Sequence, residues 1–291
     1  MSPIQRVACL YHPAIEGAEG VARDLERLIV GRGVSSWVAE LPRNGDGGLG
    51  EAVAGSDLVM CVGGDGTVLH AAGIAARADK PVFGVRMGRL GFLAEATEAE
   101  APAALVTILE GKGRLDRRTM LQAQVDGGRV LHALNDLVIG GGRIGRTVSV
   151  GLRVDGVLLA EYRADAVIAA TATGSTGYAL SVGGPILHPS SRDLIVTPVA
   201  PHLSYQNALV LPLDASVEFE VARGDGGLLM ADGLDEEPVH TGAVVRITRS
   251  ALTATFVRVG EERQFYANLA RRLGWLRIDH ALGGDTPNAA R

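Results

Sequence analysis

Lysine and aromatic residues are scarce in this 291-residue chain, and both scarcities limit what it can bind. Only Lys80 and Lys112 are lysines, aromatic residues make up 4%, and the formal net charge is -5. Affinity for a phosphate backbone needs clustered Lys or Arg, and stacking of nucleic-acid bases needs aromatic surfaces. The composition therefore argues against a dedicated nucleic-acid-binding protein, and the lack of a basic run argues against a membrane-surface protein.

Long apolar runs are missing as well, and cysteines number only two. No run approaches the roughly 20 apolar residues that cross a bilayer. Residues 1–10 lack the basic stretch and long apolar segment of a signal peptide. Cys9 and Cys61 each lie in a short apolar run typical of a buried strand, and lone buried thiols indicate a reducing compartment without a metal cluster. We expect a soluble, cytoplasmic protein with no membrane partner.

The first third of the chain alternates strand and helix patterns. Short apolar runs predict buried strands at 7–11, 58–62 and 81–85. Helical spacing follows them at 21–29, 68–76 and 102–109. Fully apolar strands that alternate with helices indicate a parallel sheet covered on both faces. We therefore predict an α/β N-terminal domain over residues 1–115.

The pattern changes after residue 115, where alternating strands are joined by tight turns. Asp126-Gly127-Gly128 and Asp155-Gly156 are typical of hairpin turns between antiparallel strands. Residues 116–262 are therefore predicted to form a β-rich, mostly antiparallel domain. Residues 264–273 have a helical pattern, and the last dozen residues are typical of a frayed tail. We expect the segment 263–291 to pack back on the first domain.

A glycine turn follows the second predicted strand. Gly63-Gly-Asp-Gly-Thr67 leads directly into a helix, so that the backbone can approach a ligand and the helix N-terminus can bind an anion. The turn is not a Walker A loop, and Leu69 stands where a dinucleotide fingerprint has its third glycine. By itself it fits either a phosphate site or a plain turn with Asp65 as the helix cap. A carboxylate among phosphate-binding amides favours catalysis, with Asp65 accepting the proton of an attacking hydroxyl.

Two further segments carry polar side chains next to apolar strands. Thr171-Ala-Thr-Gly-Ser-Thr-Gly-Tyr178 follows an apolar strand and suits a loop that wraps a flat polar ligand, with Tyr178 able to stack on a base. Asn135-Asp136 interrupts an apolar stretch, so that the pair either satisfies buried backbone or points at a ligand. Asp232-Gly233 is typical of an ordinary hairpin turn.

These segments, together with Leu90-Gly-Phe92 and Gly183-Gly184-Pro185, resemble the motifs of the NAD kinase family, in the family's order from Leu58 to about Gly274. The resemblance implies two domains with nucleotides in the cleft between them. It also implies ATP or another phosphoryl donor such as polyphosphate, a divalent metal such as Mg²⁺, and NAD as the acceptor. The expected assembly is a homodimer or homotetramer.

The resemblance also implies roles for individual residues. Asp65 is the base that takes the proton of the 2'-hydroxyl of the adenosine ribose. Tyr178 stacks on adenine, Asp165 meets the nicotinamide end, and Arg163 binds a phosphate. The residues expected at the donor phosphates are Gly63, Gly64, Gly66 and Thr67. The residues expected at NAD are Phe92, Asn135, Asp136, Arg163, Asp165, Thr173, Thr176, Gly177, Tyr178 and Ser181.

Alternatives remain at this point. Asp136 stands where the family usually has Glu, and Gly177 where it usually has Ala, which bears on the choice between NAD and NADH. The GGDGT turn is shared with diacylglycerol and sphingosine kinases, so a lipid kinase is the second hypothesis. The hydroxyl-rich loop favours a polar acceptor instead. A non-catalytic NAD-binding protein is the third hypothesis, and the presence of Asp65 argues against it.

Overall fold

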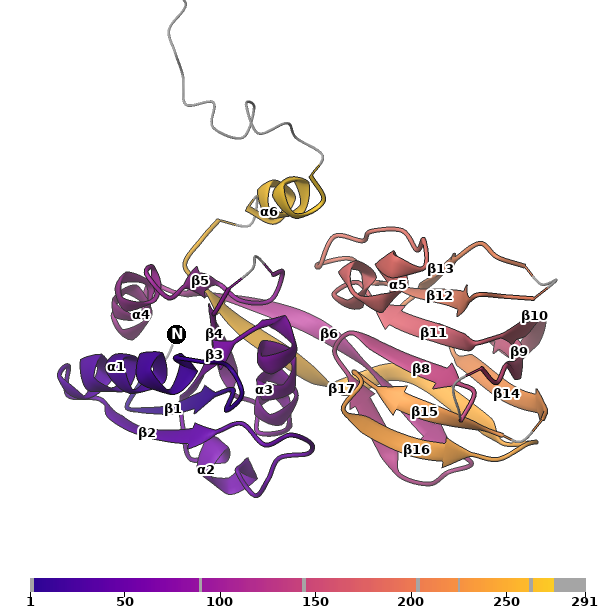
Figure 1. Ribbon diagram of the computed structural model, residues 1–291, viewed down its shortest axis with the longest axis horizontal. Coiled ribbons are helices and arrows are strands. Elements are labelled where there is room, and N and C mark those ends of the chain that lie inside the picture. The colour runs from indigo at the N-terminus through magenta and orange to yellow at the C-terminus, as the bar shows by residue number, and fades with distance from the viewer. Residues whose placement is uncertain are drawn as a thin grey trace, which may run out of the picture.

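The chain folds into two lobes that are joined by two long strands, with a C-terminal helix above their junction (Figure 1). The computed structural model describes residues 3–88, 91–142, 145–202, 205–224, 226–261 and 264–274. Leu90 of the Leu90-Gly-Phe92 motif and the predicted C-terminal tail lie outside the described residues.

The first lobe is a parallel sheet with helices on both faces. Its strands lie in the order β4-β3-β1-β2, and each is parallel to its neighbour. The strands are β1 (Arg6–Tyr11), β2 (Ser35–Glu40), β3 (Leu58–Gly63), β4 (Pro81–Arg86) and β5 (Ala96–Thr97). The helices are α1 (Ala18–Val30), α2 (Gly50–Ala54), α3 (Asp65–Arg77) and α4 (Ala101–Leu109). Helices α1 and α4 share one buried cluster with the sheet, and α2 and α3 share another on the opposite face. This covering explains why β3 is buried at every position.

The second lobe is antiparallel and consists of two sheets packed face to face. One sheet has the order β13-β12-β11-β8-β15-β16. The other contains the hairpins β6–β7 and β9–β10 together with β14 and β17. The strands are β6 (Arg114–Val125), β7 (Val130–Ala133), β8 (Asp136–Gly140), β9 (Val148–Val154), β10 (Val157–Ala164), β11 (Ala166–Thr171), β12 (Asp193–Val199), β13 (Leu209–Pro212), β14 (Val217–Arg223), β15 (Gly227–Ala231), β16 (Asp235–Val239) and β17 (Val244–Arg258). Their inward residues form one apolar cluster between the sheets.

Strands β6 and β17 run through both lobes. They contain 12 and 15 residues and pair with each other in antiparallel register along most of their length. The end of β17 pairs in parallel with β4 through Thr255 and Phe256, and its beginning pairs with β14. The parallel strands therefore belong to one 11-stranded sheet that continues into the second lobe. The predicted fold class, a parallel α/β half followed by an antiparallel β half, is confirmed.

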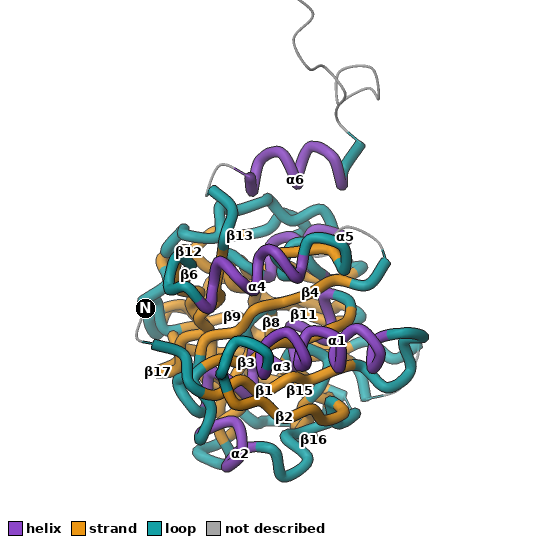
Figure 2. Tube along the Cα trace, turned by 90° about the vertical axis from the view of Figure 1, so that its left-hand side faces the viewer, coloured by secondary structure: helices purple, strands orange, loops and turns teal. Residues whose placement is uncertain are grey.

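Three helical segments lie near the junction of the lobes, namely η1 (Gly174–Thr176), α5 (Tyr178–Ser181) and α6 (Gln264–Arg272). Figure 2 shows α6 standing above the body of the molecule. The ring of Phe265 in α6 lies 6.5 Å from that of Phe92 in the first lobe and 5.1 Å from that of His188 in the second. None of the helices formed by the described residues is both long and apolar enough to cross a membrane.

Candidate active site

The segment from Gly63 to Thr67 forms the turn between β3 and α3. The Gly64 N–H donates to Thr67 Oγ1 at 3.2 Å. A Cβ on Gly63 would lie 2.5 Å from the same oxygen, so this position requires glycine. A Cβ on Gly64 or Gly66 would meet nothing within 4 Å, because both glycines face open space. The first turn of α3, with its positive dipole end, is therefore accessible to a phosphate.

Asp65 is the first residue of α3, and the loop after β4 closes over its carboxylate. Oδ2 accepts a hydrogen bond from the Phe92 N–H at 2.6 Å, and Oδ1 accepts one from the Leu93 N–H at 3.2 Å. A Cβ on Gly91 would lie 1.9 Å from Oδ1, so only glycine lets the loop approach this closely. Arg272 Nη1 also donates to Oδ2, at 3.4 Å. An ionised carboxylate has about four lone-pair sites, so Asp65 can still accept a hydrogen bond from a ligand hydroxyl.

Asp232 fixes the turn that carries Asn135 and Asp136. It lies between β15 and β16 with a φ of 55°, as an Asp-Gly hairpin turn allows. Its carboxylate also accepts hydrogen bonds from three consecutive N–H groups, those of Leu134 at 2.8 Å, Asn135 at 2.7 Å and Asp136 at 3.1 Å. Asp232 is therefore an anchor for the Asn135-Asp136 turn as well as a hairpin residue.

The carboxyl groups of Asp136 and Asp232 titrate near neutral pH. Burial, and to a smaller extent the charge of Asp232, raise the pKa of Asp136 to about 7. Burial also raises the pKa of Asp232 to about 6, although its three backbone hydrogen bonds favour the ionised form. Asp136 can therefore donate a hydrogen bond to a ligand hydroxyl as well as accept one.

The loop after β11 is tied to the same turn. Thr171 Oγ1 donates to the carbonyl oxygen of Leu134 at 2.6 Å and accepts from the Gly174 N–H at 3.0 Å. A Cβ on Gly174 would lie 2.0 Å from the carbonyl oxygen of Asn135, so the two backbones touch. The buried Ser175 hydroxyl donates to the carbonyl oxygen of Ala172 at 2.7 Å. The hydroxyl groups of Thr171 and Ser175 therefore hydrogen-bond to backbone atoms and hold the loop in its conformation.

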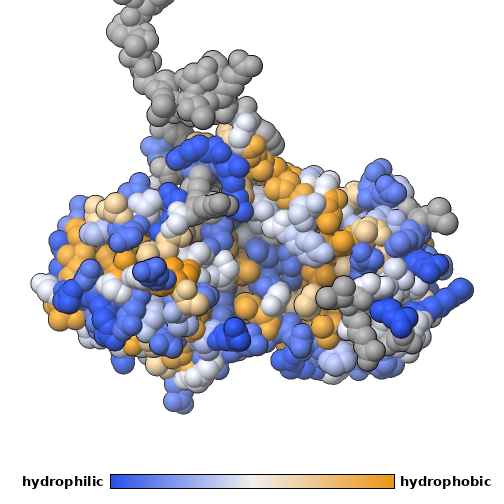
Figure 3. All heavy atoms as spheres, viewed as in Figure 1, coloured by the Kyte–Doolittle hydropathy of each residue, from blue (hydrophilic) through white to orange (hydrophobic). Residues whose placement is uncertain are grey.

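The remaining hydroxyl and aromatic residues of this loop border two adjoining cavities. The first is lined by residues of both lobes: Asp65, Gly66, Leu69, Phe92, Leu93, Asn135, Thr173, Thr176, Gly177 and Arg272. The second lies in the β-rich lobe and is lined by Asn135, Asp136, Val138, Tyr178, Met230, Asp232 and Gly233. Asn135 lines both cavities, so they are neighbours, and we refer to the two together as the groove. Figure 3 shows the surface indented between the two lobes.

Some predicted site residues lie elsewhere in the structure. Gly63, Gly64 and Thr67 belong to the turn but do not line the groove, and Thr67 is buried. Ser181 is exposed and donates to the carbonyl oxygen of Tyr178 at 2.7 Å. Arg163 and Asp165 precede β11, and neither lines the two cavities.

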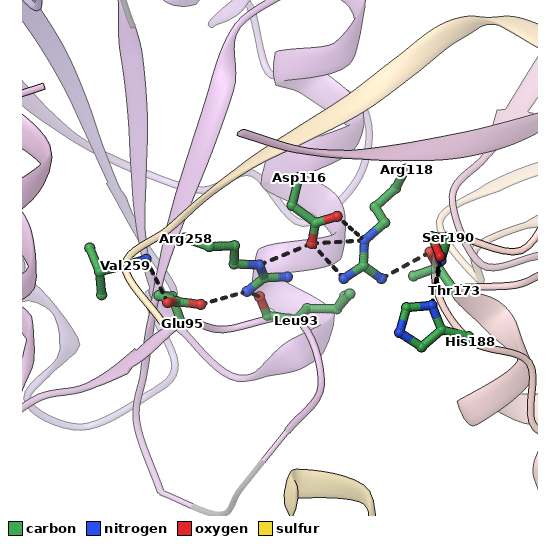
Figure 4. Close-up of polar contacts among 9 residues, drawn as sticks. All are labelled: Leu93, Glu95, Asp116, Arg118, Thr173, His188, Ser190, Arg258 and Val259. Atoms are coloured by element: carbon green, nitrogen blue, oxygen red, sulfur yellow. Dashed lines mark hydrogen bonds and ion pairs between the residues drawn. The ribbon is translucent and has the colours of Figure 1, made fainter. Parts of the chain in front are cut away.

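A buried ionic cluster connects the two walls of the groove (Figure 4). Asp116 and Arg118 on β6 pair at 2.6 Å, and Arg258 at the end of β17 pairs with the same carboxylate at 3.2 Å. Arg258 also donates to the carbonyl oxygen of Leu93 at 2.8 Å, and Arg118 donates to Thr173 Oγ1 at 3.4 Å. Burial alone would raise the pKa of Asp116, but the two guanidinium groups hold it below its ordinary value. The cluster thus links the loop that holds Asp65 to the loop after β11.

The site also contains residues that the sequence patterns did not single out. Asp232 gave only a hairpin signal, because its contacts with residues about a hundred positions away leave no local pattern. Arg118 and Arg272 are two of many arginines, and neither lies in a recognisable motif. A helical pattern at 264–273 was the only signal available for Arg272.

The fold and the groove together combine features that phosphoryl transfer uses, an anion-binding helix N-terminus and a carboxylate beside a polar pocket. A helix N-terminus and a carboxylate on an α/β lobe face a polar loop with an exposed tyrosine on a β-rich lobe. Among the described residues, no group of three or more His, Cys, Asp or Glu is placed to hold a metal ion.

Comparisons with known proteins identify the family. The ATP-NAD kinase N-terminal domain matches residues 19–113, and the ATP-NAD kinase C-terminal domain matches residues 134–259. The NAD kinase of Chloroflexus aggregans is 38% identical over 276 residues, which cover 93% of this chain and 99% of the relative. The NAD kinase of Symbiobacterium thermophilum is 40% identical over 222 residues, covering 75% of this chain and 78% of the relative.

Solved structures agree with this identification. The NAD kinase from Archaeoglobus fulgidus in complex with ATP superposes with a TM-score of 0.77 at 26% identity, covering 91% of this chain and 98% of that one. Yeast NADH kinase complexed with NADH superposes with a TM-score of 0.82, covering 96% of this chain and 91% of that one. At 22% identity this second likeness shows the shared fold alone.

The chain belongs to the NAD kinase family. It is therefore an enzyme, a kinase that phosphorylates NAD and binds ATP. The resemblance seen in the sequence is confirmed, and the match of the β-rich lobe to an NAD kinase domain favours this activity over the lipid kinase alternative.

Proposed function

We propose that this enzyme transfers the terminal phosphoryl group of ATP to the 2'-hydroxyl of the adenosine ribose of NAD, with Asp65 as the general base. The observation that carries the proposal is the groove that joins Asp65 to the Asn135-Asp136 turn and Tyr178. A nucleoside bound in the second cavity would point its ribose toward the first, where the carboxylate lies.

The second cavity suits the adenosine half of NAD. Tyr178 is 43% exposed and borders the cavity, so its ring is available to stack on adenine. Asn135 lies where the two cavities meet, and Asp136 lies deeper beside Asp232. A buried carboxyl group whose pKa is about 7 can hydrogen-bond to a ribose hydroxyl in either protonation state. Thr173, Thr176 and Gly177 then face the ribose and the phosphates.

The chemistry requires one proton acceptor beside the reacting hydroxyl. The 2'-oxygen forms a bond to the terminal phosphorus of ATP while the bond from that phosphorus to the bridging oxygen breaks, which releases ADP. The hydroxyl proton passes to Asp65. A free aspartate is a weak base for an alcohol, but the oxygen becomes acidic as it bonds to phosphorus, so transfer late in the step is favourable.

The donor phosphates are proposed to lie at the first turn of α3, along the open backbone of Gly64 and Gly66. Helix N-termini favour such anions because their N–H groups and dipole face the ligand. The described residues offer no carboxylate cluster for a metal, and Mg²⁺ commonly binds through substrate phosphates and water. We therefore propose that Mg²⁺ arrives on the phosphates of ATP.

We also propose a homo-oligomer, a homodimer or homotetramer, in which Arg163 and Asp165 serve the NAD bound by a neighbouring copy. Neither residue lines the two cavities of this chain, which supports this. The adjacent edge strand β10 also exposes Val157, Leu158 and Leu159, by 65%, 47% and 51%. Mixing inactive Asp65→Asn and Asp165→Ala subunits would restore activity if the site is shared, and would leave the mixture inactive if it is not. A reducing, cytoplasmic setting is proposed from the buried free thiols of Cys9 and Cys61.

The proposed reaction is tested by the identity of its product. The purified protein is incubated with NAD, Mg²⁺ and either ATP or polyphosphate, and the product is offered to a dehydrogenase that accepts only the 2'-phosphorylated cofactor. We expect this dehydrogenase to turn over after incubation with ATP. A phosphorylated product that the dehydrogenase rejects would show that a different hydroxyl is the acceptor. Product formed with polyphosphate but not with ATP would identify polyphosphate as the donor.

A further inference from the structure

Arg272 is placed at the reacting end of the groove by a helix outside the two catalytic lobes. Its Nη1 lies 3.4 Å from Asp65 Oδ2, and its guanidinium carbon lies 4.2 Å from the centroid of the Phe92 ring. The ring contacts of Phe265 with Phe92 and His188 hold α6 against both lobes. Arg272 is thus part of a packed arrangement that spans the junction.

The charge balance of the first cavity makes this position significant. Among the described residues that line it, Arg272 is the only cation and Asp65 the only anion. Phosphoryl transfer brings the charged oxygens of the donor close to the Asp65 carboxylate, and like charges at this distance repel. A guanidinium group beside them offsets that repulsion, and its planar donors match phosphate oxygens.

We propose that Arg272 binds the phosphoryl group in transfer, so that α6 is part of the active site. The inference rests on the proposed reaction at Asp65. Arg272 has five N–H donors, of which the contact with Asp65 uses one. The others donate to non-bridging oxygens as the 2'-oxygen bonds to phosphorus and ADP leaves. Arg272 forms no covalent bond, and the proton still passes to Asp65.

The neighbouring residue Arg271 provides a matched control. It occupies the same last turn of α6, so both arginines interact similarly with the C-terminal end of the helix dipole. Arg271, however, donates to Asn268 Oδ1 at 2.9 Å and lines a separate cavity beside Arg86 and Glu100. Removing either charge perturbs the helix alike, but only Arg272 is near Asp65.

The test compares NADP formation by wild type, Arg272→Gln, Arg272→Lys and Arg271→Gln, with NAD affinity measured by calorimetry. We expect Arg272→Gln to lower kcat by about 10²–10³-fold, as loss of a transition-state donor does, with the NAD Kd within about threefold because NAD binds mainly in the second cavity. The kcat of Arg272→Lys should lie between those of wild type and Arg272→Gln, since lysine keeps the charge without the planar donors. Arg271→Gln should match wild type.

Two results would overturn the role of Arg272. One is a kcat for Arg272→Gln within about threefold of wild type, and the other is an equal loss in Arg271→Gln, which would assign the effect to the packing of α6. The wild-type rate in the same assay reports on the proposed reaction separately, so failure of one idea is distinguishable from failure of the other.

Discussion

Single residues at this site owe their roles to neighbours that are close in space and distant in sequence. Asp65, Asn135, Thr173 and Tyr178 were predicted from local motifs, and the structure gathers them around one groove. Asp232 could not be predicted as an anchor, because its three hydrogen bonds reach residues 96 to 98 positions away. Arg272 contacts a residue 207 positions away, which no local pattern encodes.

The exposed ring of Tyr178 leads to a prediction about binding. Tyr178→Ala should weaken NAD binding by about 1–3 kcal/mol if the ring stacks on adenine. Because stacking on the base acts equally before and during reaction, kcat should change little. Calorimetry and steady-state kinetics measure the two effects, with Tyr205→Ala as the control, since Tyr205 is also exposed but lines neither cavity of the groove. An unchanged NAD Kd would remove Tyr178 from the site.

The raised pKa of Asp136 leads to a prediction about pH. In the unfolded chain its pKa is the ordinary 3.8, and in the folded protein it is about 7, so the folded state holds this proton more tightly. The stabilising contribution of the proton is complete below about pH 4 and is lost as pH rises through about 7. The side chain introduced by Asp136→Asn cannot ionise, so this variant does not lose stability at this position as pH rises.

Chemical denaturation of both proteins across that pH range checks the sign. The free energy of unfolding of Asp136→Asn, relative to wild type, should rise between about pH 4 and pH 7 and then level off. A difference that stays constant with pH would show that Asp136 ionises normally in the folded protein.

Secondary-structure elements were predictable where one physical signal dominated. Strands β1, β3 and β4 are apolar because helices cover both faces of the sheet. The Asp126-Gly127 and Asp155-Gly156 pairs have positive φ at both residues, as tight hairpins require. Strand β2 was not predicted, because Ser35–Glu40 is an edge strand with no fully buried residue. Helix α2 was missed because five residues are too few to show a helical period.

The contact between the loop after β11 and the Asn135-Asp136 turn can be tested through one glycine. A Cβ on Gly174 would lie 2.0 Å from the carbonyl oxygen of Asn135, a backbone clash that neither segment can relieve by rotating a side chain. Gly174→Ala should therefore destabilise the protein by at least about 2 kcal/mol and weaken NAD binding. Urea denaturation and calorimetry measure both.

Gly142→Ala is the matched control, because a Cβ there meets nothing within 4 Å. Its stability should stay within about 0.5 kcal/mol of wild type. Equal stability of the two variants would mean that the loop and the turn are not in contact.

The molecule combines parallel strands in one lobe with antiparallel strands in the other. The sequence predicted both kinds of pairing, but not the strands that connect the two lobes. The change of pattern near residue 115 predicted the second lobe, but β6 and β17 pass through the junction, and their pairing over more than a hundred residues leaves no local signal. The division into 1–115, 116–262 and 263–291 stays a prediction. The ionic cluster of Asp116, Arg118 and Arg258 arises only because these strands cross between the lobes.

The central proposal is that a carboxylate from one lobe accepts the proton of a ribose hydroxyl held by the other. Asp65→Asn tests it most directly, with Asp57→Asn as a control on an aspartate outside the groove. Single-turnover NADP formation by Asp65→Asn should fall by about 10²–10⁴-fold, the usual contribution of a general base. Its NAD Kd should stay within about threefold of wild type. Formation of NADP by Asp65→Asn at a rate near that of wild type would contradict the account.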